Sequence, residues 1–310
     1  MTGGISLMVG AVLASATPVG PCLQWQEGVR VGTLDPGLLN EASGIAASRA
    51  FPGRFYHNND SGDGPYFYVT DERGDAVRRI AITGFEPRDV EDLALGACAG
   101  APSCLYVGDI GDNAASRPLV RFLEIAETAD FAATVAPLRI IEARYPDGPH
   151  NAEGFAIHPN GDLFLITKAA DARNHQSGPA QIFRLSAAQL ATPPGEVQEF
   201  TLVGAIDLPA LINDAYMNQV ATAMDISADG QRALILTYRG LIEWRQDLSV
   251  PFDGAATLEP TRDYSWAPLP VLPQAEAAAY LPAGDGVVYS TEVVAPFRAA
   301  PLIEQACERR

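Results

Sequence analysis

The sequence predicts an all-β protein, a β-propeller with five blades, with six blades as the alternative. Three observations predict this fold. Five segments share one pattern, they recur at the spacing of propeller blades, and helical periodicity is scarce along the 310 residues. Each segment reads as a strand of small residues, a glycine-containing turn and a strongly apolar strand. Such a hairpin with two further strands makes one propeller blade.

The repeats begin at residues 41, 89, 151, 220 and 274, which leaves 48 to 69 residues for each blade and its loops. The turns are clearest at Asn160-Gly161 and Asp229-Gly230, because both dipeptides favour tight hairpins. A sixth, degenerate blade would have to lie within one of the two longest intervals. Residues 186–190 are expected to form a single helical turn.

The ends of the chain are expected to meet. The last repeat leaves too few residues for four strands of its own, so the segment Val29–Leu34 should supply the missing outer strand and close the ring. Four cysteines allow three pairings. We favour Cys98 with Cys104, which flank a short loop, and Cys22 with Cys307, which ring closure would bring together.

Residues 5–16 form an apolar run without charge that ends in Ala14-Ser15-Ala16, although no lysine or arginine precedes it. The pattern predicts a signal peptide over residues 1–16 and one propeller domain over residues 23–307. A secreted or periplasmic location follows, and paired cysteines are typical of it. Residues 5–16 are too few to span a bilayer as a helix, and no other stretch approaches 18 apolar residues.

The formal net charge of −17 argues against nucleic acid and anionic membranes as partners, because both would be repelled. We therefore expect a monomer that takes a small-molecule substrate and does not insert into a membrane.

Alignment of the repeats gives two polar columns at the start of the first strand. The first column holds Glu41, Asp89, Asn151, Val220 and Gln274, and the second holds Ser43, Glu91, Glu153, Thr222 and Glu276. Column partners are two positions apart, so both side chains should face the central channel. Two carboxylates about 4 Å apart repel by roughly 4 kcal/mol at an effective dielectric near 20. An all-oxygen cluster of this kind favours a bound Ca²⁺ ion.

The ends of the second strands add further candidates. Asp60 and Asp109 follow two of these strands, and His150 precedes the acidic column of a third repeat. Any of the three could act as nucleophile or general base. Lys168 and Arg239 are placed to stabilise developing negative charge.

Glu153-Gly154 at the start of an inner strand, with acidic or amide residues at the same place in other repeats, resembles the calcium-dependent propeller hydrolases. These include gluconolactonase-type lactonases, paraoxonases and diisopropylfluorophosphatase. The resemblance implies a central Ca²⁺ ion held by Glu41, Glu91, Asn151, Glu153 and Glu276. The enzymes of that group have six blades and fewer acids at the metal. Segments such as Asn59-Asp-Ser-Gly-Asp63 and Val107-Gly-Asp-Ile-Gly-Asp-Asn113 also resemble a set of exported bacterial propeller proteins.

Two functions follow as hypotheses. The first is a Ca²⁺-dependent hydrolase of esters, lactones or phosphotriesters, in which the central cation acts as a Lewis acid. The alternative is a non-catalytic propeller of the cell envelope that binds a glycan or a protein and keeps calcium for structure, because fold alone does not decide function.

Overall fold

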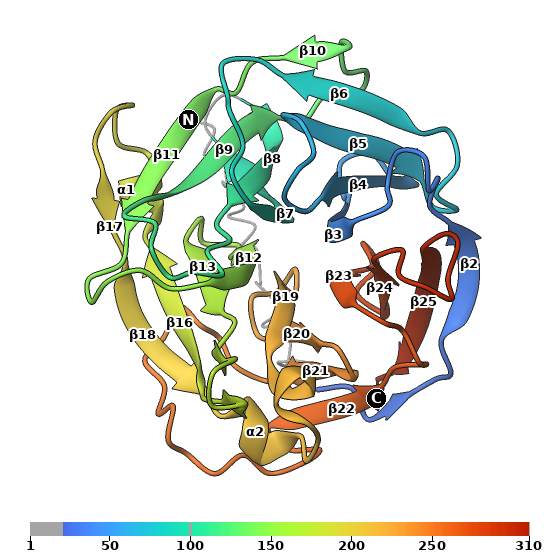
Figure 1. Cartoon of the computed structure of the whole chain (residues 1–310), viewed down its shortest axis with the longest axis vertical. Coiled ribbons are helices and arrows are strands. Elements are labelled where there is room, and N and C mark those ends of the chain that lie inside the picture. Colours follow the sequence, from blue (N-terminus) through green and yellow to red (C-terminus); the bar gives the residue numbers. More distant parts are fainter. Residues whose placement is uncertain (1–20, 99–100, 310) are drawn as a thin grey trace, which may run out of the picture.

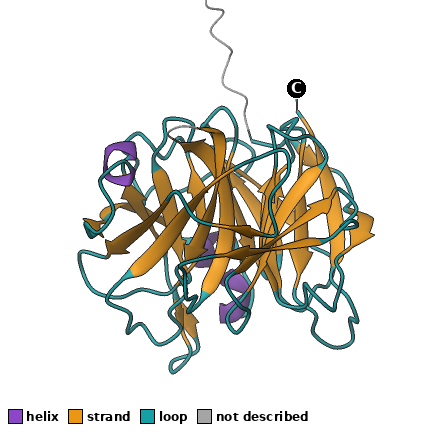
Figure 2. Ribbon diagram, turned by 90° about the horizontal axis from the view of Figure 1, so that it is seen from above, coloured by secondary structure: helices purple, strands orange, loops and turns teal. Residues whose placement is uncertain are grey.

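The computed structural model describes residues 21–98 and 101–309, and the predicted signal peptide lies outside these residues. Five sheets, antiparallel through their four blade strands, stand around a central axis, each with its first strand innermost (Figure 1). Seen from the side, the strands fill the body of the ring and the loops gather at its two faces (Figure 2). The prediction of a five-bladed β-propeller is confirmed.

Each blade is a four-stranded meander that runs from the axis outward. Blade 1 contains β3 (Ala42–Ala47), β4 (Arg54–Asn59), β5 (Tyr66–Asp71) and β6 (Arg78–Ile82). Blade 2 contains β7 (Val90–Cys98), β8 (Ala101–Asp109), β9 (Val120–Ala126) and β11 (Arg139–Arg144). Blade 3 contains β12 (Ala152–Ile157), β13 (Leu163–Thr167), β16 (Ala180–Leu185) and β18 (Thr201–Ile206). Blade 4 contains β19 (Ala221–Ile226), β20 (Ala233–Thr237), β21 (Gly240–Trp244) and β22 (Tyr264–Pro268).

Blade 5 is built from both ends of the chain. It contains β23 (Ala275–Tyr280), β24 (Gly286–Thr291), β25 (Pro301–Glu308) and the N-terminal strand β2 (Val29–Thr33), which pairs antiparallel with β25. A short strand β1 (Gln24–Trp25) pairs with the end of β25. Figure 1 shows β2 beside β25, which confirms the predicted closure. Disulfides join Cys22 to Cys307 and Cys98 to Cys104, as predicted.

Short strands and helical turns lie within the loops, and two of the short strands pair with the outer edges of blades. The outer strand of blade 1 pairs with β10 (Thr134–Val135) and that of blade 2 with β17 (Gln198–Glu199), so neighbouring segments cover these exposed edges. A small hairpin, β14 (Ala170–Asp171) with β15 (Gln176–Ser177), follows the second strand of blade 3. The helical turns are α1 (Ala187–Leu190), α2 (Leu208–Leu211) and the 3₁₀ turn η1 (Tyr216–Gln219). Ser186 caps α1, so the turn predicted at 186–190 is confirmed.

The apolar core lies between the blades. Each of the five buried clusters contains residues from two adjacent blades. The rings of Phe122 on blade 2 and Phe155 on blade 3, for example, meet edge to face with centroids 5.1 Å apart. Because every blade needs its neighbours to bury its faces, the ring positions the axial side chains as a unit.

Candidate functional site

A β-bulge places the second polar column at the axis. In every blade the register between the first and second strands shifts by one residue at the same point. The extra residue is in each case the member of the second column: Ser43, Glu91, Glu153, Thr222 and Glu276. All five side chains are buried. A bulge bends a strand and redirects one side chain, which explains why this column points inward in all five repeats.

A third column completes the mouth of the channel. It consists of the residue that directly follows the second strand of each blade: Asp60, Ile110, Lys168, Tyr238 and Glu292. The backbone N–H groups of Asp60, Lys168 and Glu292 donate to carbonyls of first-column residues over 2.8–3.0 Å. These bonds fix the third column beside the first one. Tyr238 was not predicted as a site residue, although its position in the repeat is the same as that of Lys168.

Three carboxylates converge between blades 1 and 2. One oxygen each from Asp60, Asp89 and Glu91 lies within 4.8 Å of the others. The hydroxyl of Ser43 donates to Glu91 over 3.2 Å. Gly111 lets the loop after β8 approach closely, because a Cβ atom there would lie 2.2 Å from Glu91 Oε1 and 2.5 Å from Asp89. This oxygen set fits a hard divalent cation such as Ca²⁺. We call Asp60, Asp89 and Glu91 the acidic triad.

A hydrogen-bonded chain crosses blades 3 to 5 beside the acidic triad. Lys168 Nζ lies 3.0 Å from Glu153 Oε1 and donates to the Tyr238 hydroxyl over 2.9 Å. Tyr238 in turn donates to Glu276 Oε1 over 2.7 Å. Asn151 Nδ2 also donates to Glu153 Oε1, over 3.0 Å. Glu153 and Glu276, predicted as metal ligands, are thus engaged by a lysine and a tyrosine.

Burial and mutual repulsion raise the pKa values of the acids at the mouth. Burial, followed by the charge of Asp60, raises the pKa of Asp89 to about 6. The pKa of Glu91 lies well above its usual value because of burial and the nearby Glu153 and Asp60. Burial raises the pKa of Glu153 to about 7 although Lys168 opposes the shift, and burial with Glu276 raises that of Glu292 to about 9. A bound cation would relieve this repulsion.

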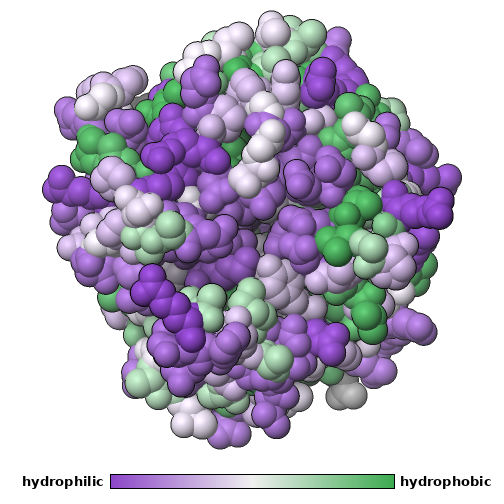
Figure 3. Space-filling model, in the orientation of Figure 1, coloured by the Kyte–Doolittle hydropathy of each residue, from purple (hydrophilic) through white to green (hydrophobic). Residues whose placement is uncertain are grey.

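A cavity of about 560 Å³ opens next to this chain of residues. Its walls come from the loop after β8, from the start of blade 3 and from the β14–β15 hairpin, and they include Asn113, His150, Asn151, Lys168 and Gln181. Figure 3 shows that the centre of the ring is hollowed and is surrounded by hydrophilic residues. The volume lies in the range of small-molecule sites.

Two of the predicted catalytic residues are held in ion pairs. The carboxylate of Asp109, fully buried, binds the guanidinium of Arg117 at 3.0 Å and that of Arg121. Arg239 pairs with Asp214 at 3.2 Å with 45% of its side chain exposed. Each differs by one position from the third column, where Ile110 and Tyr238 stand. Because side chains alternate along a strand end, one position is enough to change the direction of a side chain. The catalytic roles predicted for both residues remain predictions.

Two further predicted residues lie at the margin of the candidate site. His150 lines the cavity, and its Nε2 lies 2.9 Å from Asp147 while its ring packs on Tyr145 and Phe183. Glu41 is exposed, and its contribution to the mouth is a carbonyl that accepts the Asp60 N–H over 2.8 Å. The roles predicted for both residues remain predictions.

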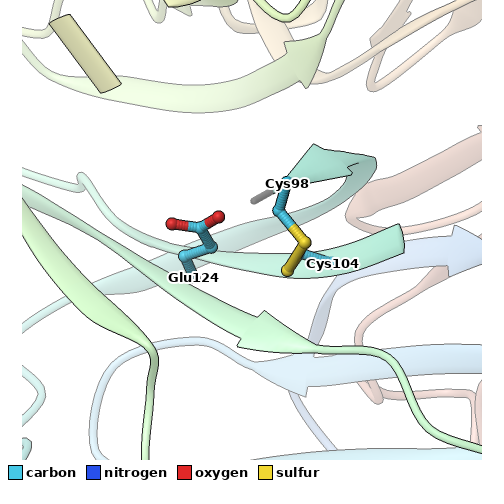
Figure 4. A group of neighbouring side chains, drawn as sticks. All are labelled: Cys98, Cys104 and Glu124. Atoms are coloured by element: carbon cyan, nitrogen blue, oxygen red, sulfur yellow. A yellow bond between two sulfur atoms is a disulfide. The ribbon is translucent and has the colours of Figure 1, made fainter. Parts of the chain in front are cut away.

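Cys98, Cys104 and Glu124 form another close group (Figure 4). The two sulfur atoms are bonded to each other. Disulfide sulfurs are not thiolates, and the thiolate is the metal-binding form of cysteine. This group is therefore not a metal site.

The fold and the axial residues define a five-bladed β-propeller with an acidic channel mouth. No protein-family model and no curated protein sequence matches the chain. Among solved structures it is similar to a luciferin-regenerating enzyme, with 10% identity and a TM-score of 0.48 over 90% of this chain and 94% of that one. A Thermus thermophilus protein described as a putative glucose dehydrogenase shows 12% identity and a TM-score of 0.48 over 91% and 100%.

Hydrazine synthase of Kuenenia stuttgartiensis shows 14% identity and a TM-score of 0.45 over 82% of this chain and 93% of that one. Likeness at this level carries no argument about activity. The resemblance stated from the sequence is confirmed as far as the β-propeller, and its hydrolase and calcium parts remain predictions. Among the described residues no helix is long and apolar enough to cross a membrane.

The raised pKa values predict a pH-dependent stability. Without metal, Glu153 should bind its proton up to about pH 7 in the folded protein but only to about pH 4.5 when unfolded. The folded state therefore holds more protons, and the free energy of unfolding should fall by about 2–3 kcal/mol between about pH 5 and about pH 9 from this group alone. Urea unfolding in chelator at several pH values measures it. Added calcium should flatten the profile; stability that rises with pH in chelator would contradict the prediction.

Proposed function

We propose that this protein is a calcium-dependent hydrolase of esters, lactones or phosphotriesters. The observation that carries the proposal is the convergence of the acidic triad with the Glu153–Lys168–Tyr238–Glu276 chain, of which Lys168 also lines the 560 Å³ cavity. The two disulfides support export as part of the same proposal.

Asp60, Asp89 and Glu91 would hold the cation, because they supply oxygens close enough to share one ion and carry more charge than their surroundings neutralise. A bound calcium ion would polarise the carbonyl or phosphoryl oxygen of the substrate as a Lewis acid. Asp60 was predicted as nucleophile or base. We assign it to ion binding, because its carboxyl group lies beside that of Asp89 and interacts with it.

Side chains of the protein would transfer the proton and stabilise the developing negative charge. Glu153 lies against Lys168 and Asn151 at the channel mouth, and its carboxylate could accept a proton from water. Lys168 lines the cavity with its ammonium group held by Glu153 and Tyr238, so it can donate to an oxygen on which negative charge develops. Glu292 lies beside Glu276, and burial with the repulsion of Glu276 raises its pKa to about 9 in the metal-free protein.

Elemental analysis of the purified protein, followed by assays of chromogenic esters, lactones and phosphotriesters with and without chelator, tests the proposal. We expect about one calcium per chain and turnover that chelation abolishes. Glu91→Gln should lower calcium affinity by about 100-fold, because it removes one carboxylate of the triad, and should lose turnover with it.

Glu142→Gln is the matched control. Glu142 lies on β11, the outer strand of the same blade, and should leave metal content and turnover unchanged. Turnover that persists in metal-free protein would contradict the proposal. Stoichiometric calcium whose removal lowers only the melting temperature, with no turnover in either state, would favour the non-catalytic binding protein of the cell envelope.

A further inference from the structure

Lys168 is the only lysine in the chain; all other members of its 21 lysine and arginine residues are arginines. This single ammonium group lies at the mouth of the axial channel, and 11% of its side chain is exposed. The arginines for which ion pairs are described hold carboxylates elsewhere, for example Asp109 and Glu243. Lysine and arginine are not equivalent, since an ammonium is a compact group with three N–H donors on one atom.

Two of the three N–H groups of Lys168 have fixed partners. Glu153 Oε1 lies 3.0 Å from Nζ, and the Tyr238 hydroxyl accepts from Nζ over 2.9 Å. The ammonium also lies 5.3 Å from the centroid of the Tyr238 ring. Within the described part of the chain no third acceptor is bonded to Nζ, while Lys168 lines the cavity. The third donor is therefore available to a molecule in that cavity.

Tyr238 is itself held in place. Its hydroxyl donates to Glu276 Oε1 over 2.7 Å, so its lone pairs remain free to accept from Lys168. Burial and the charge of Glu276 raise the pKa of Tyr238, which keeps the phenol protonated and this direction of donation fixed. Glu276 is the bulge residue of blade 5. The direction of the Tyr238 hydroxyl is therefore set by blade 5, whereas Lys168 belongs to blade 3.

We propose that Tyr238 is a positioning residue that directs the third N–H of Lys168 into the cavity, where it donates to the substrate oxygen that gains negative charge during hydrolysis. Without the Tyr238 hydroxyl, the flexible lysine would keep its ion pair with Glu153 but lose the second hydrogen bond that orients its ammonium group. The proposal rests on the proposed function for its kinetic effect, whereas the placement of the ammonium can be tested without any substrate.

The single lysine makes the placement directly measurable. Protein labelled with ¹⁵N-lysine should give one side-chain ammonium signal in NMR spectra, with slow hydrogen exchange because the group is buried and bonded. Tyr238→Phe should raise that exchange rate by at least about fivefold, since it removes one hydrogen-bond acceptor. Tyr264→Phe is the control: Tyr264 lies on β22, the outer strand of the same blade, and should leave the signal unchanged.

Kinetics test the consequence for catalysis. Lys168→Met should lower kcat about 100-fold and Tyr238→Phe about tenfold, with KM within about twofold, because the donation strengthens in the transition state. On the Lys168→Met background, Tyr238→Phe should have no further effect on kcat. Losses that multiply in the double variant, or an effect on KM alone, would overturn the positioning role.

The NMR and kinetic experiments distinguish failure of the proposed hydrolase from failure of the positioning role of Tyr238. If the wild-type protein turns over no substrate, the proposed hydrolase fails, and the ammonium signal alone decides whether Tyr238 positions Lys168. Faster exchange in Tyr238→Phe then supports the placement. Exchange that is the same in Tyr238→Phe and in the wild type overturns it, whether or not the protein is a hydrolase.

Discussion

Replacing Cys22 and Cys307 together by serine is expected to lower the free energy of unfolding by about 4–5 kcal/mol. The disulfide joins residues 285 positions apart, so its loss frees almost the whole chain in the unfolded state. In the folded state it holds β1 and the end of β25 together at the point where the ring closes. Urea unfolding followed by circular dichroism measures the change.

The second disulfide provides an internal control. Cys98 and Cys104 are 6 positions apart, so the loop that they close is short. Serine at both positions should cost about 3 kcal/mol less than opening the ring, because loop-closure entropy grows with the logarithm of loop length. Equal losses for the two pairs would show that ring closure does not dominate the stability of this propeller.

Glu243→Gln is expected to destabilise the protein by about 3–5 kcal/mol, the usual cost of breaking a buried ion pair. Glu243 lies on β21 and is fully buried. Its carboxylate accepts from the Cys22 backbone N–H over 2.5 Å and from Arg309 over 2.5 and 3.1 Å, so both ends of the described chain converge on it. The Tyr280 hydroxyl donates to it over 3.0 Å. The amide keeps the shape but removes the charge that these donors share.

The same unfolding measurement on Glu199→Gln tests whether burial is the reason. Glu199 pairs with Arg144 at 2.9 Å, but both side chains are more than half exposed. Exposed pairs contribute about 0–1 kcal/mol, so this variant should unfold close to the wild type. A small effect at Glu243 would mean that the buried ion pair contributes little to holding the ends together.

Much of the fold was predictable because its signals are local. Turn dipeptides such as Asn160-Gly161 mark hairpins, and the repeat spacing gives the blade count. The pairing of Cys22 with Cys307 follows from closure, since a ring brings the two ends of a chain together. The outer strand Val29–Thr33 was predictable for the same reason.

The candidate site was predictable only in part. The second column, with Glu91, Glu153 and Glu276, was found because it occupies the same position in every repeat. Its inward direction was expected from strand alternation, whereas the structure shows that a bulge in each blade produces it. The predicted residues Asp109 and Arg239 lie one position from the third column, because the end of a strand cannot be located to one residue from its sequence.

By itself the sequence determined the all-β propeller, the closure of the ring and the acidity of the axis, and it favoured five blades over six, because each of these follows from a repeated local pattern or from a count of residues. Only the tertiary structure decided which acids meet and which are already neutralised. The acidic triad joins blade 1 to blade 2, and the chain from Glu153 to Glu276 crosses three blades. Those contacts depend on how neighbouring blades pack around the axis, and packing between segments far apart in the chain leaves no signal in any one of them.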